Sequence, residues 1–171
     1  MLKKEKRNRE IIIWAAGFFD GEGSITIQKA NGYNLQVNIV GSNLSALNIF
    51  KEYWGGKINI MNRIGDEIGK TGYKVRHTAY QLSFNHGDKE TKQLLQDLLP
   101  YLVVKKELAE LALEYLEGIR QFLRYRPTRG RGIRMSRREI KYREEMWKKF
   151  RDLQDLDSNI IPDNAQRTLP L

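Results

Sequence analysis

The chain has 171 residues, 40% of them hydrophobic, which is enough for one domain with a buried core and excludes wholesale disorder. It contains no cysteine, so disulfides and cysteine-based zinc sites are excluded. The longest apolar run, residues 11–19, is too short to span a membrane, and no cleavage site of small residues follows it. We therefore expect a cytoplasmic protein, or one of an organellar matrix if an organelle encodes it, and the net charge of +9 favours an acidic partner.

The N-terminal half of the chain predicts a helix, a hairpin and a second helix. Residues 8–19 have a broad apolar helical face, and a glycine at position 21 or 23 can supply the turn that ends it. Residues 24–28 and 35–39 alternate between apolar and polar side chains and predict a β-hairpin. The next helix is capped by Ser42 or Asn43 and closed by two glycines at 55 and 56.

A second hairpin is predicted from residues 57–63 and 77–84, with Ile58 and Ile60 pointing into the core of the domain. Helical spacing then covers residues 89–99, 105–122 and 138–156. The chain therefore reads as an α+β fold of order α-β-β-α-β-β-α-α with a C-terminal helix, in which a four-stranded antiparallel, saddle-shaped sheet is backed by helices. We assign residues 1–156 to one domain, which includes a basic loop at 120–143, and residues 157–171 to a loose tail.

The outward face of this sheet carries side chains that form hydrogen bonds but few charges. Such side chains read the edges of bases, whereas phosphates are bound mainly by lysine and arginine. An ordinary solvent-facing sheet is the alternative interpretation. The candidate DNA-binding residues of the two hairpins are Ser24, Thr26, Gln28, Gln36, Asn38, Lys57, Asn59, Met61, Arg63, His77 and Gln81.

The net positive charge of the chain is concentrated in residues 120–143. This segment holds nine arginines and one lysine against a single acid, so the rest of the chain is balanced. A solvated charged face normally mixes both signs, and an arginine-rich block with glycines is more typical of a phosphate-binding loop. We expect Arg129, Arg131 and Arg134 to contact phosphates.

Two carboxylates, Asp20 and Glu22, stand at the end of the first helix in the stretch "AAGFFDGEG". An anion is disfavoured at a helix C-terminus, and a second one adds repulsion. A divalent cation reverses this, because carboxylate and carbonyl oxygens are the ligands that Mg²⁺ prefers. The small residues before the acids would also let a second helix approach closely.

This stretch, residues 15–23, closely resembles the LAGLIDADG motif of homing endonucleases, with Gly17, Asp20 and Gly23 identical. The order of helices and hairpins that follows the motif, through about residue 119, also resembles that family. The resemblance implies that Glu22 and the carbonyl of Gly21 bind Mg²⁺, although most such motifs carry aspartate where Glu22 stands.

Two further catalytic residues follow from the resemblance. A polar residue after the second strand orients water in this family, and by register it falls on Asn43, which could instead only cap its helix. A lysine after the third helix is expected near the scissile phosphate, and Lys105 is the first candidate, with Lys106 second. Asp20 is then a structural residue at the helix end.

The motif occurs once in the chain, which the resemblance associates with homodimers. The motif helices would form the interface, through Trp14, Ala16, Gly17 and Asp20, and would bring two Glu22 carboxylates together over DNA. The resemblance thus predicts an intron-encoded, Mg²⁺-dependent endonuclease that cuts double-stranded DNA at a long, nearly palindromic site. The alternative is an inactive binder of this fold, such as an intron RNA maturase or a DNA-binding regulator; a third reading, led by the arginine block, is an RNA-binding protein.

Overall fold

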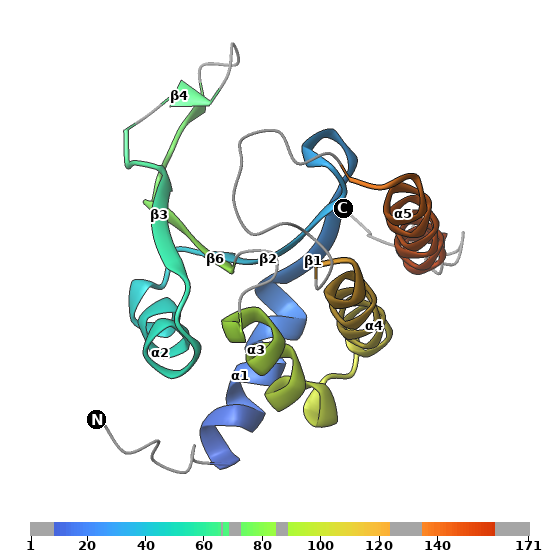
Figure 1. Ribbon diagram of the computed structural model, residues 1–171. Coiled ribbons are helices and arrows are strands. Elements are labelled where there is room, and N and C mark those ends of the chain that lie inside the picture. Colours follow the sequence, from blue (N-terminus) through green and yellow to red (C-terminus); the bar gives the residue numbers. More distant parts are fainter. Residues whose placement is uncertain (1–8, 66, 69–72, 85–88, 124–134, 160–171) are drawn as a thin grey trace.

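The computed structural model has the predicted α+β architecture, with four antiparallel strands packed on helices. In Figure 1 the sheet curves strongly; α1, α2, α3 and α4 lie on its convex side, and α5 lies beside α4. Its strands run in the order β1-β2-β6-β3, so β1 and β3 are the outer strands. The structure describes residues 9–65, 67–68, 73–84, 89–123 and 135–159.

Two hairpins build the sheet, as the alternating patterns predicted. The first pairs β1 with β2, and the second pairs β3 with β6 across a small extra hairpin of β4 and β5. The strands are β1 Gly23–Gln28, β2 Asn34–Gly41, β3 Lys57–Asn62, β4 Glu67–Ile68, β5 Tyr73–Lys74 and β6 Ala79–Phe84.

The helices extend beyond their predicted ends at two functionally relevant places. Helix α1 continues through Asp20 and Glu22, and α5 continues three residues into the predicted tail. None of the helices in the described residues is long and apolar enough to cross a membrane. The helices are α1 Arg9–Glu22, α2 Leu44–Trp54, α3 Lys89–Leu98, α4 Lys106–Leu123 and α5 Arg137–Asn159, with 3-10 turns at η1 Lys29–Asn31 and η2 Leu99–Tyr101.

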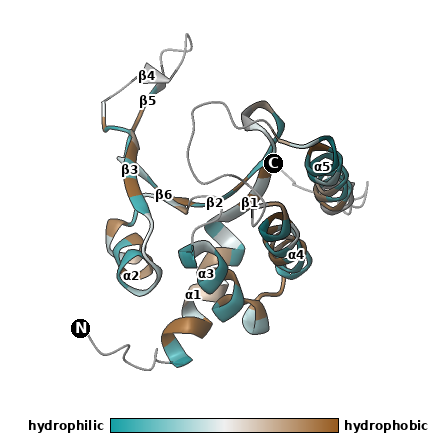
Figure 2. Cartoon of the chain, in the orientation of Figure 1, coloured by the Kyte–Doolittle hydropathy of each residue, from teal (hydrophilic) through white to brown (hydrophobic). Residues whose placement is uncertain are grey.

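The core lies between the inner face of the sheet and the helices. Every second residue of β1 and β2 is buried, because side chains alternate between the two faces of a strand. Against them pack Phe19 of α1, Phe50 of α2 and Leu95 of α3, all fully buried. Figure 2 shows the resulting division of α4 and α5 into hydrophobic and hydrophilic sides.

The junction of α1 and β1 requires glycine for steric reasons. A Cβ on Gly23 would lie 2.5 Å from the carbonyl oxygen of Phe19 and 2.6 Å from its ring. Neither Gly21 nor Gly23 has a positive φ, so the expectation that one of them supplies a left-handed turn was wrong. The helix passes directly into the strand, and Gly23 permits that close approach.

The second hairpin departs from the predicted pattern at Ile60. This side chain was expected to point into the core, but it is 51% exposed. The reason is that β3 is an outer strand, and its ladder with β6 is interrupted by a bulge between Ile60 and Asn62. Only Ile58 of this strand packs against the core.

A buried ion pair within α5 orients the arginine that attaches this helix to the rest of the fold. Arg143 Nη2 lies 2.8 Å from Glu139 Oε1, and both side chains are less than 5% exposed. Arg143 Nη1 also donates to the carbonyl of Gly32 at 3.1 Å and to the hydroxyl of Tyr115 at 3.2 Å. Burial raises the pKa of Tyr115 to about 12, so its hydroxyl keeps the proton that it donates to the carbonyl of Tyr33.

Two further contacts fit α5 to its neighbours. The ring of Tyr142 lies against Gly118 of α4, where any Cβ would be 2.0 Å from the Tyr142 hydroxyl oxygen. Further along α5, Gln154 Nε2 donates to the carbonyl of Ile25 in the outer strand β1 at 3.3 Å. Arg143 was counted among the basic residues of the segment 120–143, which was expected to bind phosphates. For Arg143 this was wrong, because its guanidinium is buried and bound within the fold.

Candidate functional site

The last turn of α1 presents Glu22 at the rim of the sheet. Glu22 is exposed, and β1 begins at the next residue. Gly21 beside it is also exposed, and a Cβ there would meet no atom within 4 Å. The carbonyls of a last helical turn have no partner within the helix, so this end of α1 offers oxygen atoms together with the Glu22 carboxylate.

The carboxylate of Asp20 is turned towards the segment before α4. Its Oδ2 accepts a hydrogen bond from Val103 N at 2.8 Å, and its Oδ1 accepts one from Lys105 N at 2.9 Å. An anion that is unfavourable at the end of α1 is thus favourable at the start of α4. The carboxylate of Asp20 is therefore bound within its own chain, and its expected place in a dimer interface stays a prediction.

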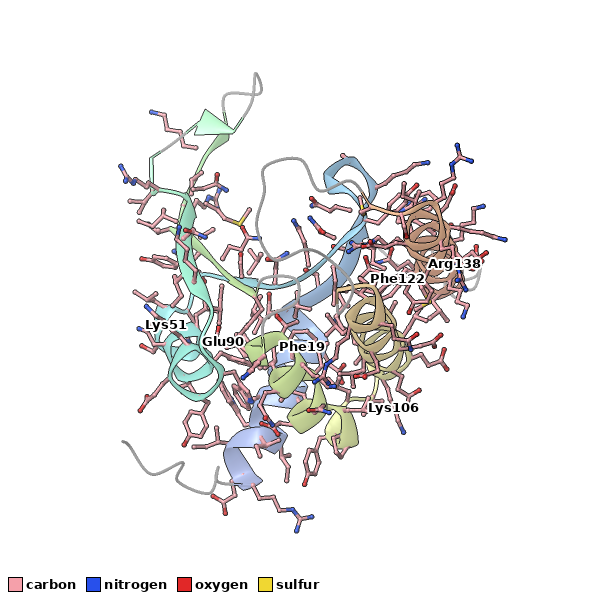
Figure 3. All side chains as sticks on the ribbon, viewed as in Figure 1. Phe19, Lys51, Glu90, Lys106, Phe122 and Arg138 are labelled. Atoms are coloured by element: carbon pink, nitrogen blue, oxygen red, sulfur yellow. The ribbon has the colours of Figure 1, made fainter. Side chains whose placement is uncertain are left out.

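The side chain of Lys105 lies at the same end of α1. Its ammonium donates a hydrogen bond to the backbone carbonyl of Asp20, two residues before Glu22. A cation at this position offsets the negative end of the helix dipole. Lys106, the second lysine candidate, is exposed at the start of α4, and Figure 3 shows it at the periphery of the molecule. The structure therefore brings the Lys105 ammonium to the last turn of α1 and leaves Lys106 exposed.

Asn43 acts as the N-cap of α2. Its Oδ1 accepts a hydrogen bond from Ala46 N at 3.1 Å, which satisfies one of the free amides of the first turn. The capping alternative for this residue is therefore realised in the structure. A catalytic role would have to use the remaining amide nitrogen of the side chain.

The oxygen atoms at the end of α1 suit a hard divalent cation. Mg²⁺ binds one or two carboxylates and keeps several waters or phosphate oxygens, and Glu22 with the Gly21 carbonyl matches that requirement. Among the residues that the structure describes, no three His, Cys, Asp or Glu side chains cluster as a complete metal site.

The outward face of the sheet forms a continuous polar surface. Because of the strand register, Ser24, Asn38, Ser83 and Lys57 stand in one row across all four strands. Asn59 and Gln81 form part of the next row. The surface is hollowed by a cavity of about 540 Å³ that is lined by Asn34, Leu35, Gln36, Asn38, Lys57, Asn59, Gln81, Ser83 and Phe84.

Five of the predicted DNA-binding residues line this cavity, and Asn34 and Ser83 were missed. Both could have been found, because each is two positions from a predicted residue on the same strand face. Arg63 and His77 lie just outside the strands, in the segments that follow β3 and precede β6. The other candidates of the face, Ser24, Thr26, Gln28 and Met61, lie on β1 and β3, while Arg129, Arg131 and Arg134 fall outside the described residues.

Helix α1 also has an exposed apolar side. Ile13 is 46% exposed and Trp14 is 41% exposed, although the Trp14 ring contacts Phe18 and Phe50. One turn later, a Cβ on Gly17 would meet nothing within 4 Å. Ala16 was expected on this side, but it is fully buried in the core of its own chain and cannot contact a second copy.

Comparison with known proteins decides the family. The family model described as "LAGLIDADG endonuclease" matches residues 15–123. These residues include the end of α1, the whole sheet and the segment that carries Lys105. The chain belongs to the LAGLIDADG endonuclease family. Comparison with curated proteins gives no match.

Two solved structures share the fold. The archaeal intron-encoded homing endonuclease I-Vdi141I, complexed with DNA, is 16% identical over 83% of this chain and 82% of its own, with a TM-score of 0.57. The group I intron-encoded homing endonuclease I-CeuI, also complexed with DNA, is 13% identical over 88% of this chain and 69% of its own, with a TM-score of 0.51. The predicted fold and family are confirmed.

Proposed function

We propose that this LAGLIDADG protein is a homing endonuclease that cuts double-stranded DNA at a specific site. The observation that carries the proposal is the hydrogen bond from the Lys105 ammonium to the carbonyl of Asp20, two residues before the exposed Glu22, at the end of α1 where the sheet begins. An oxygen-rich site beside a surface of hydrogen-bonding side chains combines the requirements for phosphate chemistry and for base recognition. The DNA complexes of the two related structures are consistent with it.

The reaction is hydrolysis of a phosphodiester bond. The oxygen of a water molecule attacks phosphorus in line with the bond to the 3′ oxygen, which breaks as the new bond forms. Glu22 and the Gly21 carbonyl would hold Mg²⁺, which supplies charge stabilisation and a more acidic water. Lys105 donates hydrogen bonds to an anionic phosphate oxygen, and Asn43, if it acts beyond its cap, orients water through its free amide.

The sheet would lie in the major groove of the DNA. A curved surface of amides and hydroxyls can read the donors and acceptors of successive base pairs, and each good bidentate contact contributes about 1–3 kcal/mol of discrimination. The arginines of residues 120–143, apart from the buried Arg143, would add contacts to phosphates.

The exposed Glu22 and the exposed apolar side of α1 support a homodimer. Mg²⁺ accepts ligands from a second carboxylate, and a second copy related by a two-fold axis would bring its own Glu22 to the same place. The apolar side of α1 around Ile13, Trp14 and Gly17 is the surface that a second copy would cover. In Figure 2 this N-terminal half of α1 is coloured hydrophobic and extends beyond the other helices. A symmetric dimer would recognise a nearly palindromic site.

Ile13→Lys is expected to convert a dimer into monomers, because it places a charge in the apolar contact between the two α1 helices. Sedimentation equilibrium of the purified chain measures the change. Ile140→Lys is the matched control, since Ile140 of α5 is 40% exposed, close to the 46% of Ile13. A dimer that survives Ile13→Lys as well as it survives the control would place the interface elsewhere.

A second set of variants tests whether the sheet recognises bases while the arginines bind phosphates. Replacing Arg129, Arg131 and Arg134 with alanine should weaken binding to cognate and random DNA alike, and should lower the slope of log K against log salt by about one unit per lost contact. Gln81→Ala and Asn38→Ala, which alter the cavity, should relax base preference by about 1–3 kcal/mol and leave the slope unchanged.

The measurements are equilibrium binding over a range of salt and selection of preferred sites from a DNA library. Sheet variants that discriminate as well as the wild type would make the polar face an ordinary solvent-facing sheet. Incubation of the selected DNA with Mg²⁺ and with Ca²⁺ then tests cleavage itself. Specific binding without cleavage in Mg²⁺ would identify the chain as a binder that keeps the fold and lacks the activity.

A further inference from the structure

Asp20 and Lys105 each accept or donate hydrogen bonds through both the backbone and the side chain. Asp20 accepts the backbone amide hydrogens of Val103 and Lys105 through its carboxylate, at 2.8 and 2.9 Å, across 83 and 85 residues of chain. In return, the Lys105 ammonium donates to the backbone carbonyl of Asp20.

Capping of α4 explains only two of the three bonds. A carboxylate that accepts hydrogen bonds from the backbone amides just before a helix stabilises the N-terminus of that helix, whatever the orientation of the neighbouring side chains. The third bond fixes the long side chain of Lys105, which would otherwise sample many rotamers. The next residue, Lys106, offers an internal comparison, because it is exposed and no partner of its side chain occurs in the described residues. The fold thus fixes the side chain of Lys105 with a hydrogen bond and leaves that of Lys106 exposed.

The position of the fixed ammonium is chemically suited to an anion. A lysine ammonium has three hydrogen-bond donors, and the Asp20 carbonyl takes one of them. Two donors remain at the end of α1, beside a carbonyl two residues before Glu22, and Lys105 is half-buried rather than fully solvated. A pre-oriented cation loses less conformational entropy when it meets a phosphate than a free lysine does.

We infer that Asp20 is a positioning residue that holds the Lys105 ammonium beside Glu22, ready for the phosphate of the bond to be cut. The inference rests on the proposed function, since it assigns a role within that reaction. It gives the first acid of the motif a task distinct from that of the second: Glu22 holds the cation, and Asp20 acts only through Lys105.

The first test uses the metal-free chain and needs no activity. NMR of the lysine ammonium groups should show Lys105, identified by the loss of its signal in Lys105→Arg, exchanging its hydrogens with water about tenfold more slowly than Lys106, because a hydrogen bond holds it. Asp20→Asn keeps the carbonyl that accepts the ammonium but weakens the hydrogen bonds from the Val103 and Lys105 amides that place the lysine beside it, so the difference should become smaller. An unchanged Lys105 signal in that folded variant would overturn the inference, whatever the DNA experiments give.

The second test is a double-mutant cycle of single-turnover cleavage in Mg²⁺, with binding measured separately in Ca²⁺. Asp20→Asn should slow cleavage about 100-fold, as a misplaced group does, while DNA affinity stays within about twofold. In the Lys105→Ala background, Asp20→Asn should have almost no additional effect, because residues that act as a unit are non-additive. Glu107→Gln, which removes an exposed negative charge from the first turn of α4, is the control and should cut like the wild type.

The outcomes separate this inference from the proposed function. If the wild type cuts, and the rate reductions from Asp20→Asn and Lys105→Ala multiply in the double variant, Asp20 acts independently of Lys105. The inference is then wrong, while the proposed endonuclease activity remains. If the wild type does not cut its selected DNA, both fail as statements about catalysis. Should Asp20→Asn not fold, as thermal melting would reveal, Asp20→Glu takes its place in both tests, since it keeps the charge and displaces the carboxylate.

Discussion

Glu22→Gln is expected to reduce the rate of DNA cleavage by about 100-fold or more. The amide keeps the shape of the side chain but removes the negative charge that would hold Mg²⁺; charge stabilisation by the metal amounts to several kcal/mol, and each ~1.4 kcal/mol is tenfold in rate. Specific binding in buffer without divalent cations should remain within about twofold, because Glu22 stands before the strands that face the bases.

The measurement is single-turnover cleavage of the selected site, with gel-shift titration for affinity. Glu22→Asp is the informative companion, since it keeps the charge on a shorter arm and should restore part of the activity that Glu22→Gln loses. Glu107→Gln controls for a general change of charge near the site. A Glu22→Gln chain that cuts at the wild-type rate would remove Glu22 from the metal site.

Glu139→Ala is expected to lower the free energy of unfolding by about 3–5 kcal/mol, because it leaves the guanidinium of Arg143 buried without a counter-charge. That guanidinium is 4% exposed and also supports the hydroxyl of Tyr115. Urea denaturation followed by circular dichroism measures the change. The loss should be large for a single substitution, since most change stability by far less.

The same helix provides a matched control. Lys141 and Glu145 have the same spacing as Glu139 and Arg143, but their side chains are 80% and 57% exposed. Glu145→Ala should therefore change stability by less than about 0.5 kcal/mol. Equal losses in the two variants would mean that the effect comes from the alanine in the helix and that the buried pair contributes nothing of its own.

The fold could be predicted because its patterns are local. Alternation in residues 24–28 and 35–39 and helical spacing in residues 105–122 depend on neighbours in the sequence, and all three elements are present. The exposed position of Ile60 was missed because alternation gives the face of a side chain but not whether anything covers that face.

The site was harder to predict, because its contacts join distant residues. Asp20 looked unfavourable when only its own helix was considered, and its partners lie 83 and 85 residues away. Arg143 looked like one more cation in a basic block, since counting charges does not distinguish a buried guanidinium from an exposed one. Ala16 was assigned to the wrong side of α1 for the same reason: small residues suit any close contact, inside the chain or between chains.

The two margins of the sheet are unequal, and this affects how the chain can misassemble. The carbonyl of Ile25 in β1 already accepts a hydrogen bond from Gln154 of α5, so a foreign strand finds this margin occupied. At the other margin, β3 pairs with β6 alone among the described residues, and it carries a bulge and begins at the exposed Lys57. Strand exchange between copies would therefore begin at β3. A chain shortened to lack α5 would gain a second such margin, and with it a route to extended aggregates.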